Sequence, residues 1–207
     1  MPTLRRTARL FLWSSLAASA LMVLAALAWW RLHPPPPLTA TFTSSQAGVS
    51  LRYSTKLAPA ALTATDRRAG LLLRLAPTPR LPQAVQVTLR TETGLRPIVA
   101  VAHQNLRDAL LTSLAKAYPE RFPGYHQLDR RDYQLAGRDA AQVTFTYTGP
   151  SGQLIQQRLL VLARDDNTAV YLAAQATAAD FAALNPAYFD PLFASVDLTQ
   201  LQPSPTM

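Results

Sequence analysis

The chain of 207 residues contains no cysteine. This absence excludes a disulfide framework, a thiolate metal site, a cysteine nucleophile and a lipid attached to cysteine. It does not assign a compartment, because a domain large enough to bury an ordinary core needs no disulfides. Glycine is also scarce, with seven residues in all. The sequence therefore offers no glycine-rich loop of the kind that cradles phosphate groups.

The chain also has few concentrated charges, although its formal net charge is +8. Residues 1–33 hold four arginines and no acidic residue, so half of the excess belongs to this short segment. After residue 33 the longest basic runs are the pairs Arg67-Arg68 and Arg130-Arg131. A nucleic-acid-binding surface concentrates its charge into a stripe or patch. We therefore predict no nucleic-acid partner.

Metal-ligand spacing is likewise absent. The three histidines are His33, His103 and His126, and none is accompanied by a second histidine or a carboxylate at metal-site spacing. Asp165-Asp166-Asn167 is too short a ligand series for a calcium loop and instead indicates a tight turn. We predict no metal and no cofactor.

The sequence shows no group of residues typical of an enzyme. Ser151 stands in Gly149-Pro-Ser-Gly152, which lacks the Gly-x-Ser-x-Gly form of a nucleophile elbow and fits a hairpin turn. We predict that the protein is not an enzyme. An envelope hydrolase that uses Ser151 and His126 stays as an alternative.

Tryptophan is absent after residue 30, since Trp13, Trp29 and Trp30 are the three in the chain. All lie within Leu10 to Trp30, a run of 21 residues without a charge. A helix of that length spans about 30 Å, the thickness of the hydrocarbon core of a bilayer. Indole rings favour the membrane–water interface. We therefore predict a transmembrane signal-anchor helix.

Charge around this segment predicts its orientation. Arg5, Arg6 and Arg9 precede it, and the positive-inside rule then places the N-terminus in the cytoplasm and the rest of the chain outside the inner membrane. The alternative is a cleaved signal peptide, because Ala26-Leu27-Ala28 fits a small-x-small cleavage pattern. Cleavage near Ala28 would release a secreted domain.

Pro34 to Pro37 follow the apolar segment. Four prolines cannot continue a helix and form a stiff extended spacer. The predicted organisation is a cytoplasmic N-terminus at 1–9, an anchor at 10–30, a proline-rich spacer at 31–46, an extracytoplasmic domain at 47–198 and a flexible tail at 199–207.

Hydrophobic periodicity predicts the elements of the domain. Asn105 is a plausible N-cap for a helix that ends at Pro119, and a second helix is expected over 179–195 with a break near Pro186. Alternating or apolar runs predict strands at 49–53, 71–75, 84–90, 125–133, 142–147, 154–163 and 169–176.

The last three strands are joined by short turns, which forces antiparallel neighbours. The order of strands, helix, strands and helix predicts an α+β fold, in which helices flank an antiparallel β-sheet.

Features from residue 136 onward resemble the PsbP-like superfamily, which includes DcrB-like and LpqN-like envelope proteins. The features are Gly137 with Ala140 leading into a strand, the strand through Gln157 and Val161, Tyr171 opening YLAAQA, and Phe189-Asp-Pro-Leu-Phe193 before Ser195. The resemblance is carried by residues 136–198 and extends over 47–198. It implies about seven antiparallel strands between helices. It also implies non-enzymatic binding of protein partners or apolar small molecules.

The densest polar cluster joins Tyr125 and His126 with Arg130-Arg131-Asp132. A solvated strand edge explains it, but it is also the best candidate docking patch for an acidic partner or for anionic headgroups. Taken together, the sequence predicts a membrane-anchored, extracytoplasmic, non-catalytic adaptor that engages an envelope protein. The alternative is a carrier or sensor of a lipid or other apolar ligand, held in a cavity between sheet and helices.

Overall fold

The computed structural model describes residues 36–45, 47–79, 81–102, 105–135, 137–165 and 167–198. The predicted cytoplasmic segment, anchor, cleavage site near Ala28 and C-terminal tail lie outside these residues, as do Pro34 and Pro35 of the predicted spacer. Within the described ranges, no helix is both long and apolar enough to cross a membrane.

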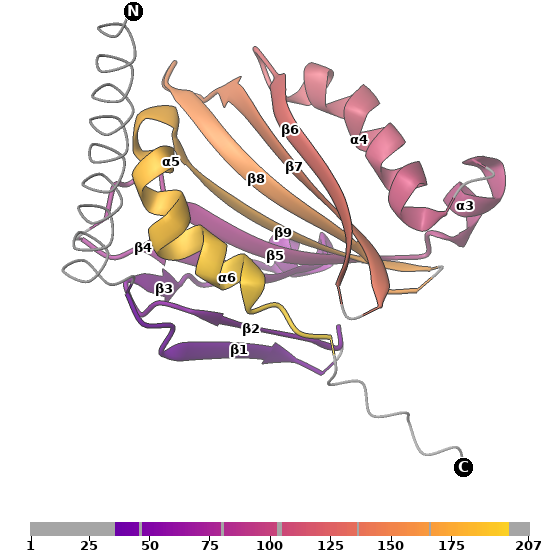
Figure 1. The fold of residues 1–207 in the computed structure, drawn as a ribbon, viewed down its shortest axis with the longest axis horizontal. Helices are drawn as coiled ribbons and strands as arrows, with labels where there is room; N and C mark the ends of the chain where they lie inside the picture. Colours follow the sequence, from indigo (N-terminus) through magenta and orange to yellow (C-terminus); the bar gives the residue numbers. More distant parts are fainter. Residues whose placement is uncertain are drawn as a thin grey trace, which may run out of the picture. The chain divides into compact units, whose positions relative to one another are not determined.

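A seven-stranded antiparallel sheet forms the centre of the domain (Figure 1). A separate two-stranded sheet pairs β1 (Ala40–Ser44) with β2 (Val49–Tyr53). The antiparallel architecture is as predicted, and seven is the strand number that the resemblance implied. The strands of the large sheet follow the order β3 (Leu57–Pro59), β4 (Leu71–Pro77), β5 (Gln86–Thr93), β9 (Thr168–Thr177), β8 (Leu154–Ala163), β7 (Arg138–Thr148) and β6 (His126–Leu135).

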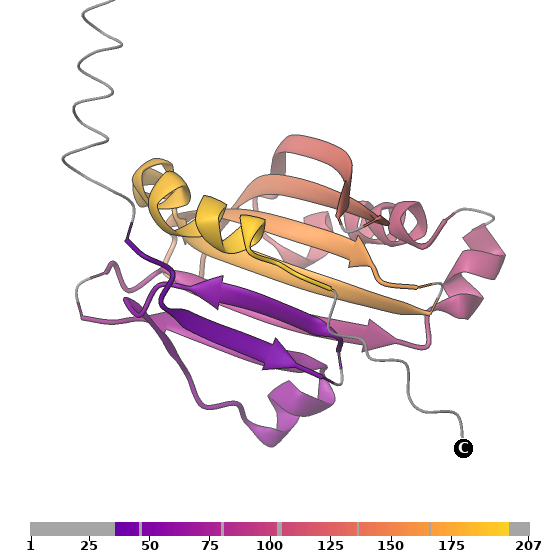
Figure 2. The same cartoon turned by 60° about the horizontal axis from the view of Figure 1, so that its bottom comes forward.

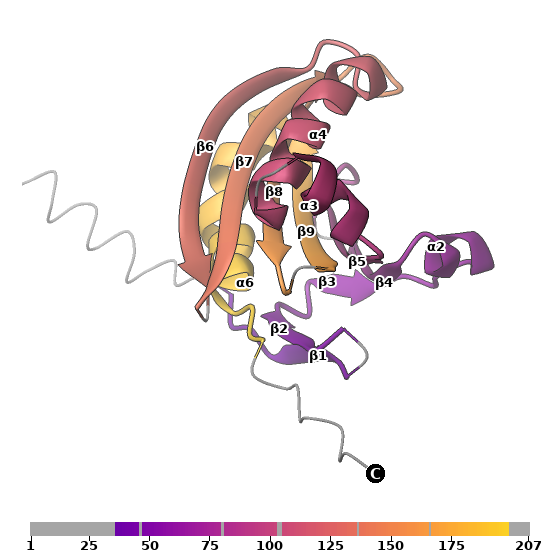
Figure 3. The same ribbon diagram turned by 90° about the vertical axis from the view of Figure 1, so that its right-hand side faces the viewer.

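Helices lie on both faces of this sheet. On one face, α4 packs against β7 and β8, and α3 packs against α4 (Figure 3). On the opposite face lie the C-terminal helices, which contact β8, β9 and the small β1–β2 sheet (Figure 2). This confirms the predicted sheet flanked by helices. The helices are α2 (Ala64–Arg68), α3 (Arg96–Ala102), α4 (Leu106–Arg121), α5 (Ala178–Leu184), η1 (Asn185–Phe189) and α6 (Asp190–Ala194).

Each face of the sheet has its own apolar core. Side chains alternate between faces along a strand, so Val170 and Leu172 of β9 face the C-terminal helices while Ala169 and Tyr171 face α4. All four are buried. The residues on both faces of the central strands are therefore largely apolar, as expected when a strand is covered on both sides.

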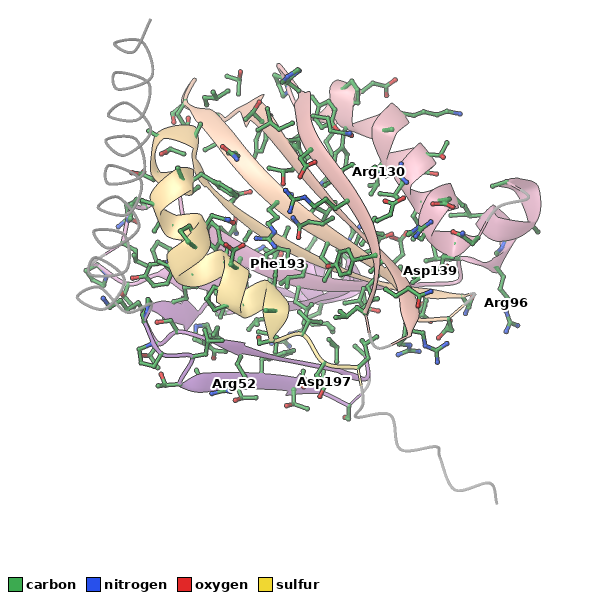
Figure 4. The ribbon with its side chains drawn as sticks, viewed as in Figure 1. Arg52, Arg96, Arg130, Asp139, Phe193 and Asp197 are labelled. Atoms are coloured by element: carbon green, nitrogen blue, oxygen red, sulfur yellow. The ribbon has the colours of Figure 1, made fainter. Side chains whose placement is uncertain are left out.

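Arg158 of β8 ties the C-terminal helices to the sheet. Its Nη1 donates to Asn185 Oδ1 at 3.1 Å and pairs with the Asp190 carboxylate. Its guanidinium carbon lies 4.4 Å from the ring centre of Phe193, which points from α6 toward the sheet (Figure 4). The break expected near Pro186 is here the π-helical turn η1, because proline has no N–H for the regular α-helical ladder.

Several boundaries differ from the prediction. The fold begins at β1, inside the range 31–46 assigned to the spacer, and the register pairs Phe42 with Leu51. A five-residue strand beside a proline run has too short a pattern to be recognised alone. Helix α4 begins as expected, with Asn105 Oδ1 accepting from the Asp108 N–H at 2.9 Å. It continues past Pro119 to Arg121, because a proline in the last turn removes only one backbone hydrogen bond.

Candidate binding surfaces

Strand β6 lies at the edge of the large sheet and, among the described residues, pairs only with β7 (Figure 1). Nine of its ten residues are exposed. The backbone N–H and C=O groups on its outer side therefore take no part in the sheet ladder. Exposed edges of this length commonly carry charged side chains, which oppose unwanted strand pairing. The predicted docking patch falls on this strand and on the residue before it.

The structure splits the charges of that patch between two faces. Arg130 and Asp132 point toward α4, where Arg130 Nη2 lies 3.7 Å from the Asp108 carboxylate (Figure 4). The Arg130 guanidinium also donates to both carboxylate oxygens of Asp132, at 2.9 and 2.8 Å. On the opposite face, Arg131 Nε donates to Asp129 at 2.8 Å. Residues adjacent in sequence thus serve two different surfaces, because side chains alternate along a strand.

These contacts neutralise the patch. Arg107 of α4 adds a third cation and lies 2.9 Å from the Asp108 carboxylate. Three arginines are thus matched by three aspartates, and the hydrogen bond from Arg130 lowers the pKa of Asp132 below its usual value. The surface presents alternating charges rather than the net positive charge that an acidic partner would select.

Tyr125 is half-buried, and its hydroxyl donates to Gln127 Oε1 of β6 at 3.4 Å. Its ring packs against Phe145 and Tyr118, with ring centres 5.2 and 5.9 Å apart, and burial raises its pKa. His126 is exposed at the start of β6. The structure therefore brings together Arg130 and Asp132, and Tyr125 lines a small gap that Arg130 also lines, whereas Arg131 lies on the opposite face.

The other candidates from the sequence are turn residues. Ser151 lies between β7 and β8, and its hydroxyl donates to Gln153; no hydrogen bond links it to His126 in the described chain. Asp165 accepts from the Asn167 N–H at 2.8 Å, as expected for a tight turn. No cluster of three potential metal ligands occurs among the described residues. His33 and His103 lie outside them.

A groove that the sequence patterns did not predict lies beside α4, and we call it the α4 groove. It forms because α4 covers β7 and β8 but leaves the neighbouring parts of β9, β5 and β4 open on this face. Its volume is about 240 Å³. Its lining residues are Leu71, Thr88, Arg90, Tyr118, Arg121, Phe122, Tyr147, Gln157, Leu159, Tyr171, Ala173 and Gln175.

Three glutamines form a row across the sheet at this groove. The strand register places Gln157 of β8 opposite Gln175 of β9, and Gln175 opposite Gln86 of β5. Gln175 accepts from the Tyr147 hydroxyl at 3.1 Å and donates to Gln86 Oε1 at 3.4 Å. Gln157 is only 8% exposed, yet its carboxamide makes no hydrogen bond to any residue that the structure describes.

Two arginines flank the same groove. Arg90 lies over the ring of Tyr171, with 4.5 Å from its guanidinium carbon to the ring centre, and Arg121 lies 5.6 Å from that of Phe122. Burial raises the pKa of Tyr118, and the charges of Arg90 and Arg121 partly offset this rise. Both cations are therefore close enough to influence the Tyr118 hydroxyl.

One sequence signal indicates this groove. Gln157 occupies the same alternating phase of β8 as Ile155, Leu159 and Val161, all of which are buried. A polar side chain among the inward-facing residues of a strand usually has a hydrogen-bond partner or contacts a ligand. The row of glutamines across the strands cannot be recognised from the sequence, because it depends on the strand register.

The core beneath α4 is closely packed. The enclosed gap lined by Leu111, Leu114, Val143 and Leu159 has a volume of about 40 Å³. That space suits a water molecule rather than an acyl chain.

Comparison with known proteins bears on the fold. No protein-family model matches the chain. No curated protein matches it either. Among solved structures, PsbP (CyanoP) from Synechocystis sp. PCC 6803 superposes with a TM-score of 0.55 at 5% identity, over 76% of this chain and 91% of that one. The domain has a PsbP-like fold.

Two further structures share this architecture to different degrees. The Ran-binding protein Mog1p of Saccharomyces cerevisiae matches with a TM-score of 0.52 at 7% identity, covering 77% of this chain and 95% of its own. LpqN of Mycobacterium tuberculosis, involved in cell envelope biogenesis, matches with a TM-score of 0.48 at 16% identity, covering 79% and 84%. The match to PsbP confirms the fold that the resemblance implied, over 76% of this chain. At these identities it concerns the fold alone.

Proposed function

We propose that this PsbP-like domain is a non-catalytic binding module of the cell envelope that engages a protein partner through β6. In this proposal, residues 10–30 hold the chain in the inner membrane and the domain lies outside. The observation that carries the proposal is the exposed edge of β6, which offers a ten-residue strand with a free outer ladder.

An extended segment of a partner can pair with such an edge through main-chain hydrogen bonds, while side-chain contacts supply specificity. The alternating charges of β6 suit that second task, because complementary charges select the partner and fix its register. The Arg131–Asp129 pair is well exposed, so exchanging its internal contact for one with a partner costs little. Mog1p, named as Ran-binding, is an example of this fold in a protein-binding role.

Photocross-linking from β6 tests the docking part of the proposal. A benzophenone amino acid at His126 in the full chain, expressed in its own host, should give one discrete protein adduct. The matched control is the same probe at Arg68, an exposed residue of α2, which should give none. Equal adduct yields from both positions would contradict a docking site on β6.

A charge exchange sharpens this test. The double variant Asp129→Arg/Arg131→Asp keeps the pair within β6 but reverses the order in which a partner meets the charges. We expect it to fold normally and to lose the adduct from His126. An unchanged yield of the adduct would show that the partner does not contact the charges on this face of β6.

The absence of cysteine makes the membrane part directly testable. Thr3→Cys and Ser151→Cys each introduce one thiol, the second in the exposed β7–β8 turn. In intact cells or spheroplasts, a membrane-impermeant maleimide should label Ser151→Cys, and Thr3→Cys only after lysis. The chain should also resist alkaline extraction from membranes. A shortened soluble product beginning after Ala28 would instead support the cleaved alternative.

A further inference from the structure

The α4 groove is independent of β6 and has the chemistry of a ligand site. Gln157 is its most informative residue, because the residue is 8% exposed, lines the groove and has no hydrogen bond to any described residue, so its carboxamide is available to a ligand. Its neighbour Gln175, one strand away in the same row, is bonded on both its oxygen and its nitrogen. The row thus ends in one open position, which faces the groove.

The groove also favours negative charge. Arg121 has no acidic partner within the described residues, and Arg90 has only Glu92, at 3.5 Å. Both guanidiniums lie over aromatic rings, an arrangement that leaves their N–H edges available for hydrogen bonding. Guanidinium groups bind carboxylate and phosphate through such edges.

Aromatic side chains line the space between these polar groups. The ring centres of Phe122 and Tyr147 are 4.7 Å apart, and Tyr118 and Tyr171 complete the wall. At about 240 Å³ the groove is smaller than the pockets of roughly 300–1,000 Å³ that hold drug-sized ligands. A single ring with one charged group suits its size, whereas an acyl chain does not.

We propose that the α4 groove binds a small aryl phosphate or aryl carboxylate. The anionic group lies at Arg90 and Arg121, the ring packs along the aromatic wall, and a polar group of the ligand hydrogen-bonds the Gln157 carboxamide.

Calorimetric titration of the full chain in a nonionic detergent tests this proposal. The probes are phenyl phosphate and 4-hydroxybenzoate, and the fragments are inorganic phosphate, acetate and phenol. At least one probe should bind about tenfold or more tightly than each of its fragments, because charge-assisted hydrogen bonds and ring packing then act together. Binding by the fragments as tight as by both probes would overturn the proposal.

Variants locate the site. Arg121→Gln changes an exposed side chain and should keep the fold while weakening the bound probe about tenfold or more. Gln157→Leu should weaken it as well. Arg131→Gln on β6 and Arg68→Gln on α2 are matched controls that should bind as the parent chain does. Unchanged affinity in Arg121→Gln would overturn the proposal. Because the β6 variants do not enter this site, failure here leaves the proposed protein docking untouched.

Discussion

The two faces of the large sheet are built for different purposes. The face toward the C-terminal helices is closed at its centre, where Leu160, Leu172 and Phe189 have no exposed surface, and it opens over β6 and β7 in a polar groove of about 390 Å³. The face toward α4 is covered over β7 and β8 but open over β9 and β5, where the glutamine row lies. The same strands supply both faces, so their alternation separates a stabilising core from a surface available to a ligand.

Two neighbouring residues of β8 show the contrast most directly. Arg158 points to the face of the C-terminal helices and contacts Asn185, Asp190 and the ring of Phe193 there, although its Nε has no hydrogen-bond partner among the described residues. Gln157 points to the open face and has no hydrogen-bond partner among the described residues. Neighbouring residues of one strand thus contribute to a packed helix contact on one face and to the α4 groove on the other.

The largest expected loss of stability follows a substitution in the core beneath the C-terminal helices. Phe189→Ala should lower the free energy of unfolding by about 3–5 kcal/mol, because it leaves a cavity among fully buried side chains. The control Phe122→Ala, on the half-buried wall of the α4 groove, should cost distinctly less. Denaturant unfolding of both variants measures the difference, and equal losses would show that the two faces are equally closed.

The next largest loss of stability is expected when the contacts of Arg158 are removed. Arg158→Met keeps the length of the side chain but removes its hydrogen bonds to Asn185 and Asp190, and should cost about 2 kcal/mol. Hydrogen exchange should show increased opening of η1 and α6 before the sheet opens. Exchange that rises equally in β6 would contradict a local role for Arg158.

Two substitutions in the glutamine row should change the free energy of unfolding in opposite directions. Gln157→Leu removes a carboxamide that has no hydrogen bond to the described residues and adds apolar surface to a largely buried position, so we expect stability to be unchanged or raised by about 1 kcal/mol. Gln175→Leu removes the bond from Tyr147 and should cost about 1 kcal/mol. Thermal unfolding distinguishes them. A clear loss of stability in Gln157→Leu would mean that this carboxamide has a structural role.

The smallest effect concerns the charges of β6. The folded-state pKa of Asp132 lies below its ordinary value of 3.8, mainly because of its hydrogen bond with Arg130. Its contribution to stability is therefore fully present above the unfolded pKa and is lost as pH falls below 3.8, through the folded pKa. Asp132→Asn should be less sensitive to acid than the parent chain in denaturant unfolding at near-neutral pH and at about pH 3. Identical pH profiles would show that the Asp132 carboxylate does not stabilise the fold.

Much of this architecture was accessible from the sequence. The strand 154–163 and the turns around it were placed correctly, since alternation over ten residues between glycine and aspartate turns is a strong local signal. Short elements such as β1 and α2 were not found, because five residues carry little periodicity, although their contacts are local: β1 pairs with the next strand, and Asp66 of α2 pairs with Arg74.

The candidate surfaces were predicted only in part. The cluster at residues 125–132 was correctly identified as lying along an exposed strand. Its division into two faces, and the pairing that cancels its charge, depend on contacts with Asp108 and Arg107 from α4. The α4 groove was missed because its parts come from α4 and from β4, β5, β7, β8 and β9, which are far apart in the chain.

By itself, the sequence determined the periodicities, the turns and the charge inventory, since these are local properties of neighbouring residues. Only the tertiary structure decided which polar residues find partners. Arg158 and Gln157 are adjacent in the chain, and their environments differ because the sheet register and helix packing place Asn185 and Asp190 near one and an open groove beside the other.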